Sequence, residues 1–139
     1  MGRRAKSVDV ARSEATLYLE KAKQFATEGR CAFEAGRQDA ALLAAVHAAI
    51  SAGDAITAAL AGQRSAESDH QRAVDFLEAV VGSEEEAGRH IRQIRMLLAK
   101  KNVVEYESRR TTQTEAVEGV ARAERVVAWA ERLVRDSAV

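Results

Sequence analysis

The stretch "AAVHAAISAGDAITAAL", residues 44–60, decides the fold, because small and aliphatic side chains cover nearly the whole circumference of the helix that it predicts. A helix that is apolar on almost every side is buried among other elements rather than laid on a surface. We therefore expect a helix from about Gln38 to Ala61 at the centre of the molecule, with the rest of the chain packed around it.

The composition favours the same conclusion. The chain has 139 residues, no proline and 8 glycines, and it is rich in Ala, Glu, Arg and Leu, which are good helix formers. This length fits one domain, in which roughly two-thirds of the unfolded surface can be buried. The sequence therefore predicts an all-α fold, an up-and-down bundle of about five helices in one domain over residues 1–139, with residues 1–7 as a flexible N-terminal tail.

Apolar periodicity predicts four more helices around the central one. They are expected over residues 8–35, over 69–81, from Ser83 through the apolar series ending at Leu98, and from Thr111 or Thr112 onward. Glycines and capping side chains mark the ends that we expect: Gly36, Gly62, Ser68, Ser83, and a capping box between Thr112 and Glu115. All the connections are short, so consecutive helices should pack antiparallel.

Charge and cysteine content narrow the class of protein. The 21 basic and 21 acidic residues balance, so net charge gives no attraction to nucleic acid or to an anionic membrane. One cysteine, Cys31, cannot form an internal disulfide; we expect it to be a small core or boundary residue in a cytoplasmic protein. The longest apolar run, "AALLAAVHAAI", is too short to span a bilayer and His47 interrupts it, so no membrane association is expected.

The central helix carries three polar residues on one face. His47, Ser51 and Asp54 stand at positions i, i+4 and i+7 of a helix that is otherwise Ala, Leu, Val and Ile. Burying such groups costs about 1–3 kcal/mol each unless they find partners. Either Ser51 bonds to its own helix while His47 and Asp54 pair with neighbours, or the three residues line a polar pocket inside the bundle.

A second polar group precedes the third helix, in "RSAESDHQR", residues 64–72. Arg64, His70 and Arg72 lie near a helix N-terminus, which attracts anions. Asp69 competes for the same backbone donors, so a solvated helix start is the alternative interpretation.

The third polar group is "KKNVVEYES", residues 100–108. Lys101 follows Leu98 on the inward face of the fourth helix, and Glu105 comes one turn later, beside Tyr106. If the helix continues, Lys101 and Glu105 form an ordinary i, i+4 pair. If it bends near Asn102, these polar groups turn toward the central helix.

The order of these segments resembles the HEPN superfamily, and most of all its small bacterial stand-alone members. The segments "HAAISAGDAI", "GQRSAESDH" and "LLAKKNVVEYES" carry the resemblance, which covers nearly the whole chain. Many HEPN proteins are metal-independent ribonucleases, often toxins, whose active site meets across a dimer. Their signature is an Arg, often an Asn next to it, and a His a few residues later. The resemblance places Lys101 at the Arg position, Asn102 at the Asn position, and Tyr106 or Glu105 at the His position.

Two of these three positions depart from the signature. Lys holds a phosphate as a point charge without the bidentate fork of Arg, and Tyr, with a pKa near 10, is a poor general base beside His near 6.5. The leading hypothesis is therefore a non-catalytic or weakly catalytic HEPN-like module that binds RNA, a nucleotide or a protein partner in a toxin–antitoxin, stress or defence setting.

Two alternatives remain open, an endoribonuclease with a substituted Lys/Asn/Tyr site and a purely structural dimeric bundle. For the binding module, the candidate binding residues are His47, Ser51, Asp54, Arg64 and His70. The resemblance implies a homodimer, with an antitoxin or a nucleotidyltransferase as a further partner. No metal-ligand spacing occurs, and no cofactor is expected.

Overall fold

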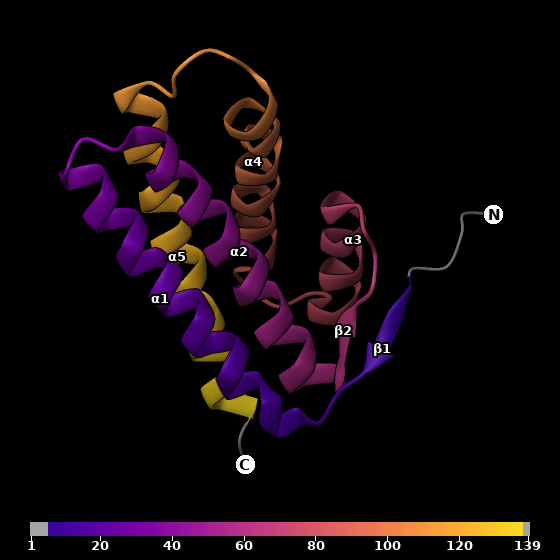
Figure 1. Ribbon diagram of the computed structural model, residues 1–139. Helices are drawn as coiled ribbons and strands as arrows, with labels where there is room; N and C mark the ends of the chain where they lie inside the picture. The colour runs from indigo at the N-terminus through magenta and orange to yellow at the C-terminus, as the bar shows by residue number, and fades with distance from the viewer. Residues whose placement is uncertain (1–5, 138–139) are drawn as a thin grey trace.

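The computed structural model describes residues 6–137 and confirms the predicted all-α bundle (Figure 1). Its helices are α1 (Ala15–Glu34), α2 (Gln38–Ala61), α3 (His70–Val81), α4 (Ala87–Tyr106) and α5 (Gln113–Ser137). A short 3-10 helix, η1 (Arg12–Glu14), precedes α1, and two short strands, β1 (Ser7–Asp9) and β2 (Gln63–Ser65), form a small antiparallel sheet.

Helix α2 is the centre of the bundle and has the bounds that the sequence predicts. It packs against α1, α5, α4 and α3, and its side chains Leu42, Val46 and Ile56 are completely buried. Figure 1 shows α1 and α5 running alongside α2, with α4 at an angle to α2 and the shorter α3 beside one end of α4. By length and composition alone α2 could cross a membrane, but 56% of its most apolar stretch lies buried inside the bundle.

Glycine makes the closest helix contact possible. Gly119 of α5 faces Leu42 so tightly that a Cβ built on it would stand 2.6 Å from Leu42 Cδ1. A Cβ on Gly29 of α1 would lie 3.3 Å from the Ala41 carbonyl oxygen and 3.5 Å from Val120 of α5. The small residues therefore set how near α1 and α5 approach the central helix, as expected for close-packed interiors.

The N-terminal region differs from the prediction. The helix expected over residues 8–35 begins only at Ala15, because residues 7–9 are extended and pair antiparallel with residues 63–65. Val8 stands opposite Arg64 in this ladder, and β-branched Val favours such a strand. Of the expected flexible tail, Ser7 belongs to β1 and residues 1–5 lie outside the described residues.

The helix ends follow the predicted chemistry only in part. Gly62 ends α2 in the left-handed conformation, with φ 64°, and the capping box before α5 is confirmed by Thr112 N–H donating to Glu115 Oε1 and Glu115 N–H donating to Thr112 Oγ1.

The predictions of Ser68 and Ser83 as helix caps are wrong. Asp69 caps α3, where its carboxylate accepts from the Gln71 N–H, and Glu84 rather than Ser83 accepts a backbone N–H before α4. Cys31, expected in the core or at its boundary, is exposed.

Candidate functional site

The end of α4 carries the residues that the family signature singles out. The helix continues through Tyr106 without bending at Asn102, and it ends at Glu107 in extended conformation. Because the helix persists, Lys101 and Glu105 form the i, i+4 ion pair, with 3.0 Å between the ammonium and the carboxylate. This pair lowers the pKa of Glu105, with a further contribution from Tyr106. The Lys101 ammonium is therefore already engaged by a carboxylate of its own helix.

Tyr106 and Asn102 lie at the surface. Tyr106 is 77% exposed and Asn102 is exposed one turn earlier. Its phenol contacts Glu105, whose pKa it helps to lower, and is otherwise open to water. The arrangement is therefore poorly suited to using Tyr106 as a general base.

Two imidazoles from other helices lie near Lys101. His70 is the first residue of α3 and is half-buried, and its pKa is lowered by burial and then by the positive charges of Lys101 and His47. His47, half-buried on α2, lies against Phe25 of α1 with 5.4 Å between ring centroids and an angle of 33° between the ring planes. We call His47, His70, Lys101 and Glu105 the polar cluster; three helices bring it together.

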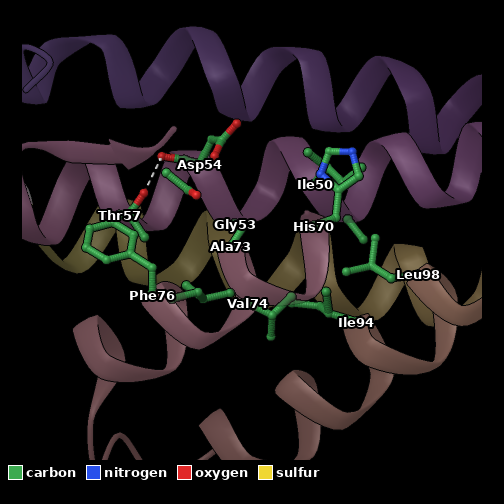
Figure 2. Close-up of a pocket in the computed structure, with 13 residues that line it drawn as sticks. Ile50, Gly53, Asp54, Thr57, His70, Ala73, Val74, Phe76, Ile94 and Leu98 are labelled. Carbon is green, nitrogen blue, oxygen red and sulfur yellow. Dashed lines mark hydrogen bonds between the residues drawn. The ribbon is translucent and has the colours of Figure 1, made fainter. Parts of the chain in front are cut away.

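A small cavity opens beside the polar cluster between α2, α3, α4 and β2. Its volume is about 30 Å³, enough for a water molecule or two but not for a nucleobase. Figure 2 shows Asp54 and His70 along one side of the cavity and an apolar wall along the other, formed by Val74, Phe76, Ile94 and Leu98.

Asp54 brings an unusual carboxylate to this cavity. Burial raises its pKa to about 6, while the charges of Arg64 and Lys21 oppose that rise. Within residues 6–137 its carboxylate accepts no hydrogen bond, whereas its backbone oxygen accepts one from the Thr57 hydroxyl at 3.3 Å. Asp54 is thus a half-buried acceptor left available at the cavity, and near neutral pH it carries a charge that its surroundings compensate only weakly.

The other predicted residues are placed as follows. Ser51 is half-buried on the same face of α2 as His47 and Asp54. Arg64 lies in β2, where its guanidinium donates to the Ser65 carbonyl oxygen at 3.2 Å. The structure thus gathers the candidates from α2 and α3 with Lys101 and Glu105, and leaves Asn102 and Tyr106 exposed at the surface of α4.

The sequence did not predict that two further residues, Lys21 and Phe25, belong to this region. They stand one turn apart on α1, and each reaches the polar face of α2: Lys21 lies near Asp54, and Phe25 contacts His47. Their spacing of four was visible, but nothing in it indicates which face of α1 meets the polar face of α2. That information comes from packing between helices.

The chemistry available here is acid–base and electrostatic. The ammonium and the imidazole N–H groups can donate to phosphate oxygens, and the carboxylate can accept hydrogen bonds. Among residues 6–137, no three His, Cys, Asp or Glu side chains are grouped so as to hold a metal ion. No protein-family model matches the chain, and no curated protein matches it significantly.

Proposed function

We propose that this protein is a HEPN-like module that binds RNA through the polar cluster and does not cleave it, or cleaves it only weakly. The supporting observation is the state of the substituted signature, in which Glu105 holds the Lys101 ammonium and the Tyr106 phenol is open to water. Lys101 can contact a phosphate oxygen as a point charge while it keeps this partner. The cavity beside His70 is too small for a base in its present form, so a base would stack outside it, where Phe25 and His47 already pair.

RNA binding is tested by fluorescence anisotropy with labelled single-stranded RNA. We expect Lys101→Gln to weaken binding and to make its salt dependence shallower by about one counterion. Lys23→Gln is the matched control, because Lys23 is also paired with a glutamate, Glu131, but joins α1 to α5 away from the polar cluster. Absence of binding by the unaltered protein, or equal weakening by the two variants, would rule out the proposed site.

One observation favours the endoribonuclease alternative. His70 brings a neutral imidazole close to Lys101, and so supplies the kind of group that Tyr106 does not. On this alternative, cleavage of a defined RNA would be lost in His70→Gln and kept in Tyr106→Phe. If the unaltered protein leaves every RNA of the panel intact on denaturing gels, the alternative is removed.

The homodimer remains part of the proposal, supported by large apolar side chains at the surface. Leu17 is 57% exposed on α1 and Met96 is 49% exposed on α4. Sedimentation equilibrium at micromolar concentration checks this. A monomer under those conditions would also favour a site completed within one chain.

A further inference from the structure

The start of α2 forms a second polar hollow, away from the polar cluster. We call it the α2 hollow; it has a volume of about 410 Å³ and is lined by Gly36, Arg37, Gln38, Asp39, Ala40, Arg110 and Thr111. It lies where the α1–α2 turn meets the connection between α4 and α5, the two turns at the same end of the bundle in Figure 1. None of the candidate site residues belongs to it.

The α2 hollow contains unused backbone donors. No side chain caps the N-terminus of α2, and its first backbone bond runs from the Ala41 N–H to the Arg37 oxygen at 3.0 Å. Within residues 6–137 the N–H groups of Gln38, Asp39 and Ala40 therefore have no acceptor. At the start of a helix of 24 residues, such donors and the helix dipole favour an anion.

Buried polar atoms without partners point to a ligand independently of the helix start. Thr111 is only 4% exposed, and neither its Oγ1 nor Gln38 Oε1, both buried, makes a hydrogen bond in the described chain. Buried polar atoms are rarely left in this state, so water or a bound group is expected to satisfy them. A threonine hydroxyl can donate to an anion, and so can a glutamine amide once its oxygen and nitrogen are exchanged.

The charges of the α2 hollow also suit an anion. In the described chain neither Arg37 nor Arg110 makes an ion pair, although both line the hollow. Asp39 carries the opposing charge, but its carboxylate already accepts from the Thr111 N–H at 2.9 Å. The Thr111 side chain and this N–H lower the pKa of Asp39, followed by the charges of Arg110 and Arg109, but the Thr111 hydroxyl meets no partner with hydrogen-bond geometry in the described chain.

From this arrangement we infer that the α2 hollow binds a phosphate group, held by the free N–H groups of α2, the Thr111 hydroxyl and the guanidiniums of Arg37 and Arg110. Arginine and backbone amides are the usual partners of phosphate in proteins. This inference does not depend on RNA binding at the polar cluster, since the two sites share no residue.

Titration with inorganic phosphate, followed by amide NMR at constant ionic strength, tests the inference. We expect saturable shifts of the Gln38, Asp39 and Ala40 amides, and about tenfold weaker binding in Arg110→Gln. Arg92→Gln is the matched control, since Arg92 is an exposed arginine of α4 for which the described chain holds no ion-pair partner. Absence of saturable shifts, or equal affinity in Arg110→Gln and the unaltered protein, would overturn the inference.

Thr111→Val separates a ligand role from a structural one. Because the hydroxyl has no partner in the described chain, its removal should leave Tm unchanged or raise it while weakening phosphate binding. A lower Tm with unchanged phosphate binding would contradict the role given to Thr111. Comparing one short RNA with and without a 5′-phosphate then identifies the source: preference for the phosphorylated form indicates a terminal phosphate, and equal binding indicates the backbone. If neither competes with inorganic phosphate, the free anion is the ligand.

Discussion

Asp54 shows how one side chain can oppose the stability of the bundle in which it lies. Its pKa is about 6 in the folded chain against an ordinary 3.8, so between these values the folded protein binds more protons than the unfolded one. The free energy of unfolding therefore decreases as pH rises through this window. The full shift corresponds to roughly 3 kcal/mol, as an upper bound.

Asp54→Asn should relieve this cost. We expect the variant to be more stable than the unaltered protein at pH 7–8, with the difference disappearing near pH 4, as measured by urea unfolding across that range. A variant that is less stable than the unaltered protein at pH 7–8 would show that the charges of Arg64 and Lys21 hold the carboxylate more strongly than burial opposes it.

His90 has the opposite pH dependence. It is 5% exposed, stacks on Trp129 at 4.9 Å between ring centroids, and leaves its Nδ1 without a partner in the described chain. Burial, and then the charge of Arg89, lowers its pKa below the ordinary 6.5. The folded protein therefore binds fewer protons, and the contribution of His90 to stability is lost as pH falls below about 6.5.

His90→Phe keeps a ring against Trp129 and removes the titration. We expect the Tm difference between the unaltered protein and this variant to shift in favour of the variant as the pH is lowered from 7 to 5. A Tm difference that stays constant from pH 7 to 5 would mean that protonation of His90 does not lower the stability of the folded protein.

Helices α2 and α5 pack so closely at Gly119 that there is no room for a Cβ atom at this position. With a Cβ only 2.6 Å from Leu42 Cδ1, Gly119→Ala must displace the leucine or separate the helices. Overpacking of this kind costs about 1–3 kcal/mol. Chemical denaturation followed by circular dichroism measures the loss.

Gly88→Ala is the control for Gly119→Ala. Gly88 lies in the first turn of α4, and a Cβ there would meet nothing within 4 Å. Alanine is the better helix former, so this variant should gain up to about 1 kcal/mol. If both variants gain stability, helix propensity rather than contact at Leu42 governs position 119.

The first and last residues of a helix or strand could be predicted only where neighbouring residues in the sequence determine them. The all-round apolar character of residues 44–60 predicted α2, and Thr112 and Glu115 predicted the start of α5, because a capping box is complete within four residues. The strand at Ser7–Asp9 could not be predicted, since its partner is at residues 63–65. A three-residue strand has no periodicity long enough to outweigh the adjoining helical pattern.

The candidate site was predictable one helix at a time. Each polar group stood out because it interrupted an apolar face, as with Asp54 on α2 and Lys101 on α4. Their meeting across three helices depends on helix rotation and on the position of α3, which sequence periodicity does not fix. The α2 hollow had no such signal: Arg110 and Thr111 are unremarkable loop residues until packing places them over the start of α2.

The pairing of β1 with β2 also decides where a protease can cut. An extended segment is cleaved readily when it is free, and poorly when its backbone is held in a ladder. Arg64, opposite Val8, should therefore resist trypsin, whereas the exposed Arg110 is cut early. Val8→Pro, which removes a ladder donor, should make Arg64 an early cleavage site, detected as new fragments by mass spectrometry. Such a result would show that the segment before α1 protects the chain between α2 and α3 from proteolysis. Early cleavage at Arg64 in the unaltered protein would contradict this.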